Sequence, residues 1–347
     1  MTLLGESLAH TWEPFVLVVG LLFIGHVAAR EGLFEYVGSR CALVPGSDAV
    51  LLAVTMTAVA LVTATLNLDT AVVFMTPVAL QAARSRSADE TAFLYGTILM
   101  TNSASLLLLG SNLTNMLVFA SQPVRGSVFT QRMSLAWLAS VVLTIALVMV
   151  WRWRPLHVRR SALEREASQL RPGPGAVAVA VAVVLMLSLS HPALPVLVIG
   201  MVVEGYGWLR RRRVDPRGLL AVANPTVVAP LFVVAVLVGW LGRTWTGPSN
   251  LLTHSGTFAT ASVAAIASVA INNLPAASLF AGRHVAHPYA LLVGLDLGPN
   301  LFMTGALSSL LWFRIARSGG ATPSVARFAL IGVPVALVTI AVSSLVI

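Results

Sequence analysis

Residues 106–120 read LLLLGSNLTNMLVFA, and this stretch determines how the rest of the chain is interpreted. It belongs to a mostly apolar run, residues 91–120, that exceeds the roughly 20 residues needed to cross a bilayer. Its polar residues are Ser111, Asn112, Thr114 and Asn115. Lipid offers no hydrogen bonds to an irregular backbone, so an interruption at that depth must face protein or a water-filled cavity. The stretch therefore predicts a membrane helix that is broken at a polar centre.

The composition of the whole chain agrees with a membrane setting. Of 347 residues, 57% are apolar and 10% are charged, whereas a soluble domain carries about 25% charged residues. This composition excludes an ordinary soluble domain, a disordered chain and a disulfide scaffold. The single Cys41 allows neither an intrachain disulfide nor a site with several thiolate ligands. We expect an all-α polytopic membrane protein.

The apolar runs predict about eight spans and two re-entrant hairpins. The expected spans lie near 14–29, 91–120, 132–151, 175–190, 193–209, 222–241, 288–313 and 325–346. Two further apolar stretches, 49–83 and 256–284, are interrupted at their middle by polar residues or proline. We interpret each as a hairpin that enters the membrane, turns near the midplane and leaves on the same side. The alternative is a pair of ordinary spans with irregular centres.

The basic residues, all of them arginine, predict the orientation. With the spans above, one side keeps only Arg125, Arg132, Arg243 and Arg283, and the other side receives the rest of the 22. The arginine-rich side is expected to be cytoplasmic, so both termini face outside a cell membrane that the chain crosses many times. The net charge of +9 then reflects topology and lipid headgroup contact, and no nucleic-acid partner is expected. Since Glu6 and Glu13 precede the first run where a signal peptide has basic residues, we expect a retained span.

The chain divides into two halves that repeat in order. Residues 1–151 and 175–347 flank a charged linker, 152–174, which we expect in the cytoplasm. Each half has a span, a polar-centred hairpin, a broken span and a plain span. The hairpin centres are Asn67–Thr70 and Asn272–Pro275, and the breaks are Gly110–Asn115 and Gly294–Asn300. An odd number of crossings separates matching spans, so the second copy is inverted, with the first half lacking two leading spans. Inverted repeats with interrupted helices are typical of secondary transporters.

Two acids lie deep within the apolar stretches, Asp69 and Asp296. Carboxylates inside a membrane are costly and usually mark an ion or proton path. The alternative is a structural carboxylate that caps a hairpin or half-helix. We expect a coupling ion, H+ or Na+, and neither an organic cofactor nor a structural metal.

Amide and hydroxyl side chains accompany these acids at the same breaks and hairpins. They offer both donors and acceptors to an ion or a small polar solute. The alternative is that they tie the unwound segments together. The candidate ion- and substrate-binding residues are Asp69, Thr70, Ser111, Asn112, Thr114, Asn115, Asn272, Asn273, Asp296 and Asn300.

Several short motifs in this order resemble those of the bacterial arsenite efflux permease (ArsB-type) family. That family belongs to an ion transporter superfamily that includes citrate and dicarboxylate carriers. The matching stretches are Arg30–Tyr36, Leu68–Thr70, Thr76–Pro77, Ser111–Asn115, Ile271–Pro275, Asp296–Pro299 and Leu310–Trp312. The resemblance implies that two hairpins and two broken helices move against a scaffold, often within a homodimer.

The sequence also departs from that family. The family usually has two more leading spans and a lysine where this chain has Asn300. Leu68 replaces the asparagine that precedes the hairpin aspartate, and Phe302 and Ala306 replace polar residues. These changes bear on the scaffold, the substrate and the charge moved per cycle.

The function predicted from the sequence is proton-coupled efflux of arsenite or a related inorganic solute. A sodium- or proton-coupled carboxylate carrier and a sodium/proton antiporter are the alternatives. An intramembrane aspartyl protease is remote, because Gly294-Leu295-Asp296 lacks the second glycine of its Gly-x-Gly-Asp motif. The chain has no His-Glu-x-x-His motif and no phosphate-binding loop, so a zinc protease is excluded and any ATPase would be a separate subunit. We therefore expect no enzymatic activity.

Overall fold

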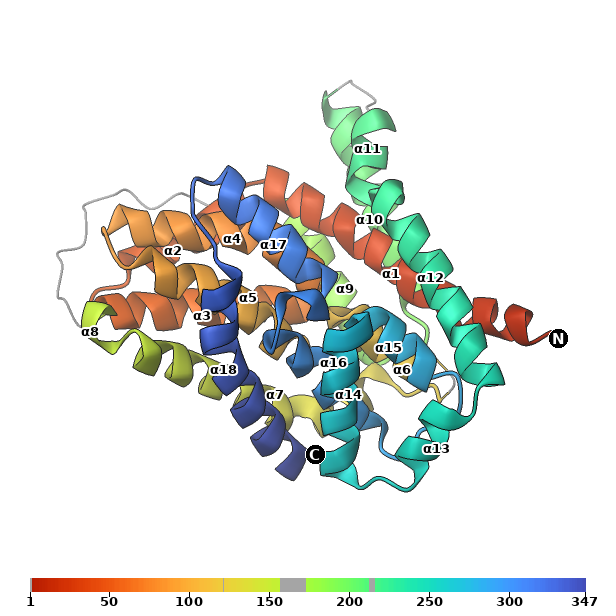
Figure 1. Cartoon of the computed structure of the whole chain (residues 1–347). Coiled ribbons are helices and arrows are strands. Elements are labelled where there is room, and N and C mark those ends of the chain that lie inside the picture. The colour runs from red at the N-terminus through yellow and green to blue at the C-terminus, as the bar shows by residue number, and fades with distance from the viewer. Residues whose placement is uncertain (1, 121, 157–172, 212–215) are drawn as a thin grey trace.

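The computed structural model describes residues 2–120, 122–156, 173–211 and 216–347 (Figure 1). Within these ranges the chain is all-helical and contains no strand, which confirms the predicted fold class. Six described stretches are long and apolar enough to cross a membrane: Leu3–Arg30, Asp48–Thr65, Gly126–Trp151, Ala193–Arg210, Leu220–Thr244 and Val325–Leu345. The chain is a multi-pass membrane protein, while the side on which its termini lie stays a prediction.

The first half runs from a long helix to a plain apolar helix. Its elements are α1 (Leu3–Arg30), α2 (Leu33–Leu43), α3 (Asp48–Thr65), α4 (Leu68–Ser85), α5 (Glu90–Ala104), η1 (Leu109–Ser111), α6 (Leu113–Phe119), α7 (Gly126–Trp151) and α8 (Trp153–Leu156). Polar side chains start several of these helices by accepting a hydrogen bond from the first turn. Thr2 accepts from Gly5 N in α1, and Asp89 accepts from Thr91 N in α5.

The second half begins with two helices that have no counterpart in the first, α9 (Pro174–Ser188) and α10 (Ala193–Arg211). The remaining elements are α11 (Pro216–Ala223), α12 (Pro225–Thr244), α13 (Gly247–Thr253), α14 (Thr257–Ile271), α15 (Asn273–Phe280), α16 (Pro288–Leu297), η2 (Gly298–Asn300), η3 (Met303–Gly305), α17 (Leu307–Ser318) and α18 (Val325–Leu345). From α12 onward the order of long, paired, broken and long helices is the order found from α1 to α7.

The two halves interlock through their hairpins. The second helix of each hairpin packs against the second part of the other half's broken helix: α4 contacts α17, and α15 contacts α6. The closing helices α7 and α18 also pack against each other (Figure 1). This reciprocal packing brings the breaks of both halves together. The inverted orientation and the unit boundaries stay predictions, and most of the expected linker, 157–172, lies outside the described residues.

Both expected hairpins consist of two helices joined at an asparagine. Asn67 accepts a hydrogen bond from Thr70 N at 2.7 Å and thereby starts α4. Asn272 accepts from Leu274 N at 3.3 Å and thereby starts α15. Since α3 alone is long enough to cross a bilayer, a turn at the midplane stays a prediction.

The second break lies further along the chain than the sequence predicts. The expected interruption, Gly294–Asn300, is helical: α16 continues to Leu297 and a 3₁₀ turn follows. The extended backbone occurs at Phe302 and Ala306. Gly294 serves close packing, because a Cβ there would lie 2.0 Å from the carbonyl oxygen of Ala261 in α14. Glycine at this position is thus a contact between two helices and does not mark the break.

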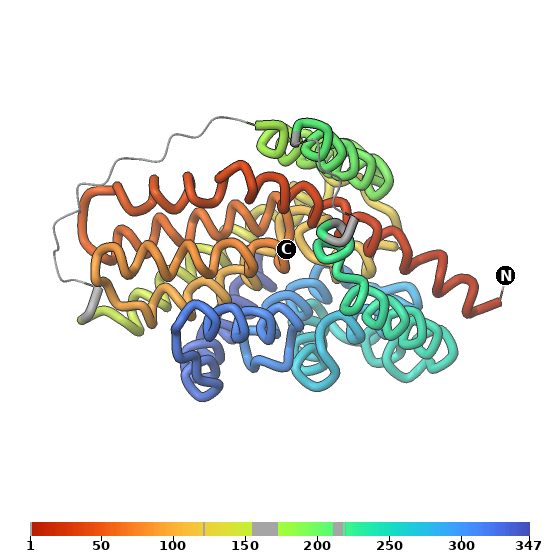
Figure 2. Tube along the Cα trace, turned by 90° about the horizontal axis from the view of Figure 1, so that it is seen from above, coloured from red at the N-terminus to blue at the C-terminus, as the bar shows by residue number. Residues whose placement is uncertain are grey.

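The additional pair α9–α10 lies on the outer side of α1 (Figure 2). The contact between α1 and α10 is close, since a Cβ on Gly20 would lie 2.7 Å from Leu197 N. A Cβ on Gly200 would likewise lie 2.7 Å from the carbonyl oxygen of Gly20. The long helix α1 therefore has α9–α10 on one side and the hairpins and broken helices on the other.

Candidate ion and substrate site

Asp296 joins the two broken helices. It lies in the last turn of α16 and is 1% exposed. One carboxylate oxygen, Oδ1, accepts a hydrogen bond from Asn112 Nδ2 at 3.0 Å and another from Thr114 Oγ1 at 2.5 Å. Both donors come from the start of α6, the second part of the first broken helix. The structure thus places an acid of one half in contact with the break of the other.

The second oxygen of this carboxylate, Oδ2, is buried and has no hydrogen-bond partner among the described residues. In that part of the chain no arginine or histidine forms an ion pair with Asp296 either. An ionised carboxylate in an apolar interior is costly unless a cation or a proton compensates it. The arrangement can therefore hold a proton or a small cation at Oδ2 while Asn112 and Thr114 fix the side chain.

Ser111 and Asn115 hold the unwound backbone of the first break. Asn115 Nδ2 donates to the carbonyl oxygens of Ser105, at 2.8 Å, and of Leu108, at 3.1 Å. Ser111 Oγ donates to the same two carbonyls. These bonds agree with the alternative in which Ser111 and Asn115 tie the unwound segment together. The Asn115 Oδ1 atom, however, is buried without a partner in the described residues, so it remains an acceptor for an ion or solute.

Asn300 connects the end of α16 to α5. Its Oδ1 accepts from Asn102 Nδ2 at 2.8 Å, and its Nδ2 donates to Ser103 Oγ at 3.2 Å and to the carbonyl of Leu99 at 3.3 Å. Ser103 Oγ in turn accepts from Thr144 Oγ1 in α7 at 2.8 Å. Asn300 therefore positions Asp296, four residues before it, against α5.

The second hairpin meets the second break at Asn272. Its Nδ2 donates to the carbonyl of Thr304 at 3.1 Å, and Thr304 Oγ1 donates to the carbonyl of Val269 at 3.0 Å. Asn272 has a φ of 74° and a ψ of 147°, a backbone conformation outside the left-handed helical region and rare for residues other than glycine. Asn273 is 5% exposed. These residues thus lie at the second hairpin and break, and no hydrogen bond joins them to Asp296 within the described chain.

The structure does not bring Asp69 and Thr70 to Asp296. Thr70 points toward α1, where a Cβ on Gly25 would lie 2.7 Å from Thr70 Cγ2. Asp69 is half-buried, and its carboxylate makes no hydrogen bond or ion pair with any described residue. The two acids that the sequence groups together therefore occupy different surroundings.

Sequence reasoning missed several residues of the site. Asn102 and Ser103 support Asn300, and the run Thr101-Asn102-Ser103 inside an apolar stretch was the signal that could have found them. A further buried acid lies near the ends of α1 and α10. Glu204 of α10 is 3% exposed, with its carboxylate 3.7 Å from His26 Nε2 and 3.9 Å from Arg30 Nη1.

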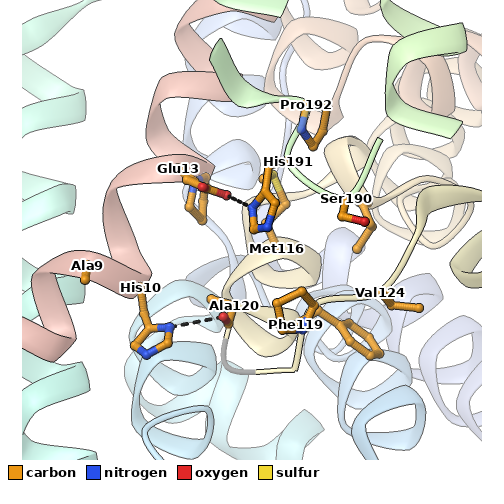
Figure 3. Close-up of a pocket in the computed structure, with 13 residues that line it drawn as sticks. Ala9, His10, Glu13, Met116, Phe119, Ala120, Val124, Ser190, His191 and Pro192 are labelled. Atoms are coloured by element: carbon orange, nitrogen blue, oxygen red, sulfur yellow. Dashed lines mark hydrogen bonds and ion pairs between the residues drawn. The ribbon is translucent and has the colours of Figure 1, made fainter. Parts of the chain in front are cut away.

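A cavity of about 230 Å³ lies between α1, α6 and the turn that joins α9 to α10 (Figure 3). Leu109 and Met116, which flank the first break, line it together with residues of α1 and the turn between α9 and α10. At its rim Glu13 Oε2 lies 2.9 Å from His191 Nδ1. This cavity lies beside the first broken helix, and its lining does not include Asp296.

Comparison with known proteins identifies the family. The model of the citrate transporter family, CitMHS, matches residues 3–304. The chain belongs to this family. The match includes both breaks up to Thr304 and therefore the site around Asp296. It supports the membership of the ion transporter superfamily that the sequence motifs predicted, while assignment to the arsenite permeases is not confirmed.

A solved structure is similar to this CitMHS family member over nearly its whole length. The YdaH transporter of Alcanivorax borkumensis, described as having an unusual topology, matches with a TM-score of 0.57 at 14% identity. The match covers 99% of this chain and 86% of the other. At that identity the likeness shows the fold alone, which is that of a transporter. No curated protein sequence matches this chain.

Proposed function

We propose that this secondary membrane transporter couples solute movement to an ion that binds at Asp296. The observation that carries the proposal is the geometry of that carboxylate: Oδ1 is held by the opposite break, and Oδ2 is buried without a described partner. A charge change at Asp296 alters a contact between two broken helices. Ion binding and helix movement are thereby linked.

The coupling ion that we propose is H+, bound at Oδ2. One unpartnered oxygen is enough for a proton. Sodium is the second candidate, because Asn102 Oδ1 and Asn115 Oδ1 are also buried acceptors without partners in the described chain. Carboxylate and carbonyl oxygens suit hard cations. The alternative function is sodium/proton antiport, in which both ions bind at Asp296 in turn and no other solute is transported.

The first substrate that we propose is a small neutral hydroxide such as arsenite, exported from the cell. The groups that contact Asp296 are an amide and a hydroxyl, which can donate to and accept from such a solute. A carboxylate of the citrate type is the second candidate, and the CitMHS family match favours it. A dianion would need a bound cation to offset the negative charge of Asp296.

In this proposal the transporter consists of two inverted repeats, residues 1–151 and 175–347, and lies in a cell membrane with both termini outside. The hairpins and broken helices move against α1 and the pair α9–α10, and two copies form a homodimer. The reciprocal packing of α4 on α17 and of α15 on α6 supports the repeat of the two halves. A separate ATPase subunit stays a proposal of lower rank, since an ion gradient is sufficient for the site described.

The substrate is tested in a host that lacks its own arsenite efflux. Cells that express this chain are grown on arsenite, on antimonite and at high sodium, and vesicles from the same cells are assayed for citrate uptake. We expect growth on both metalloids. Asp296→Asn should abolish rescue, while Asp89→Asn, a change in the turn between α4 and α5, should preserve it. Citrate uptake without metalloid rescue, at equal expression, would replace the first substrate by the second.

A further inference from the structure

A second pocket lies where α1, α9 and α10 end together, away from Asp296. It has a volume of about 250 Å³. Arg30 and Glu31 at the end of α1, and Tyr206 and Arg210 near the end of α10, form its polar wall, and Val27 and Val203 form its apolar wall. Because α1 and α10 are both long enough to span the membrane, a pocket at their ends lies at the level of the lipid headgroups.

Arg210 is the arginine of this pocket that is free to bind an anion. Arg210 makes no hydrogen bond or ion pair with any described residue and is exposed. Arg30 is 40% exposed, and Glu204 offsets it only at a distance of 3.9 Å. Glu31 is turned toward α9, where its Oε2 accepts from Gly175 N at 2.8 Å. Two guanidinium groups from different helices therefore border the pocket, and of these two only Arg30 lies within 4 Å of a carboxylate oxygen among the described residues.

In the sequence, Arg210 begins a run of four arginines. Arg211, Arg212 and Arg213 follow Arg210 directly. Arginine clusters that adjoin the end of a membrane helix attract anionic lipid headgroups. Arginine is also the side chain that binds phosphate through two parallel hydrogen bonds.

An apolar strip leads away from the pocket along α10. Val198, Val202 and Tyr206 are spaced four residues apart, so they share one face of the helix. They are 51%, 62% and 50% exposed. Free phosphate would make no use of such a strip, whereas the acyl chains of a phospholipid would cover it.

We propose that this pocket binds an anionic phospholipid, with its phosphate between Arg30 and Arg210 and its acyl chains along Val198 and Val202. The bound lipid joins α1 to α10, the close helix pair on the outer side of the molecule (Figure 2). The pocket is distinct from the ion site, so lipid binding does not depend on the proposed transport function.

The test is native mass spectrometry of the full-length protein in detergent. Dioleoyl phosphatidylglycerol, dioleoyl phosphatidylcholine and inorganic phosphate are titrated separately. We expect phosphatidylglycerol to bind at least about fivefold more tightly than phosphatidylcholine, since one juxtamembrane arginine contributes about that factor. Arg210→Gln should remove most of this preference, and Arg210→Lys should keep it. Arg314→Gln, which removes an exposed arginine from α17, is the matched control and should change nothing.

Arg210→Gln carries the test because Arg210 is exposed and has no described partner, so the protein should still fold. Adding Arg30→Gln should remove the preference that remains. Equal binding of the two lipids by the unaltered protein would overturn the proposal. So would an equal loss of preference in Arg210→Gln and Arg314→Gln. Displacement of the lipid by millimolar inorganic phosphate would also overturn it, because the pocket would then be a site for free phosphate.

Discussion

Asp296 and Asp69 are both acids in the polar centre of an apolar stretch, yet their surroundings differ. Asp296 is almost fully buried and is held by Asn112 and Thr114 of the other half. Asp69 is half-buried, and no described side chain bonds to it. The sequence alone does not indicate which of the two is more important for transport. Under the proposed function, an ion at Asp296 would alter a contact between the two halves, whereas an ion at Asp69 would alter no described hydrogen bond.

The largest effect is expected from Asp296→Asn. The amide still accepts from Asn112 and Thr114, but it no longer carries a charge that a cation neutralises. Substrate flux in reconstituted vesicles should fall by about a hundredfold, equivalent to about 3 kcal/mol of lost coupling free energy. Membrane insertion and the elution profile should match those of the unaltered protein. Flux within threefold of that protein would remove Asp296 from the mechanism.

Asp69→Asn should abolish gradient-driven accumulation of substrate but, unlike Asp296→Asn, should leave substrate exchange intact. Because Asp69 does not bridge the two halves, the variant should keep substrate exchange at equal ion concentrations on both sides. The two assays are run on the same vesicles, with and without an ion gradient. If exchange is lost together with accumulation, as in Asp296→Asn, the two acids act alike and the distinction between them fails.

Alanine substitutions of the same two acids should lower the free energy of unfolding by different amounts. Asp296→Ala leaves Asn112 Nδ2 and Thr114 Oγ1 without their shared acceptor, and the free energy of unfolding should fall by about 2–4 kcal/mol. Asp69→Ala removes no described hydrogen bond and should cost less than about 1 kcal/mol. Unfolding by sodium dodecyl sulfate in mixed micelles measures both. Equal losses would show that Asp69 has a partner of comparable strength.

The smallest effect is expected from a matched pair of threonine variants. Thr114→Val removes one of the two donors to Asp296, so transport should fall by about tenfold, the equivalent of one lost hydrogen bond to a charged group. Thr70→Val removes a hydroxyl that faces α1 and has no hydrogen-bond partner in the described chain, so transport should change little. Initial transport rates are measured for both variants. A larger loss of rate in Thr70→Val than in Thr114→Val would place the site at the first hairpin.

Much of the fold follows from the sequence because membrane helices need long apolar runs and polar breaks need partners. The broken helix at Ser111–Asn115 and the asparagine turn at Asn272 could be predicted on that ground. The position of the second break could not, since Gly294 and Gly298 serve helix packing against α14. A glycine that permits a turn and one that permits contact look the same in a single sequence.

The candidate site could be predicted in part. The meeting of Asp296 with Asn112 and Thr114 agrees with the expectation that a polar interruption in a membrane helix faces protein or a water-filled cavity. The direction of Thr70 toward α1 and the burial of Glu204 depend on how whole helices rotate and pack, which local patterns do not determine. Asn102 and Ser103 were missed because they lie within the continuous helix α5, where no break in the helix marks them.

Proton movement that accompanies substrate flux tests the central claim most directly. Vesicles that contain a pH-sensitive dye receive the unaltered protein, Asp296→Asn or the control Asp89→Asn, and substrate is then added. The account predicts a substrate-dependent pH change for the unaltered protein and for Asp89→Asn, and none for Asp296→Asn. A parallel series with a sodium-sensitive dye covers the second candidate ion. Substrate-driven flux of either ion at the unaltered rate in Asp296→Asn would contradict the account.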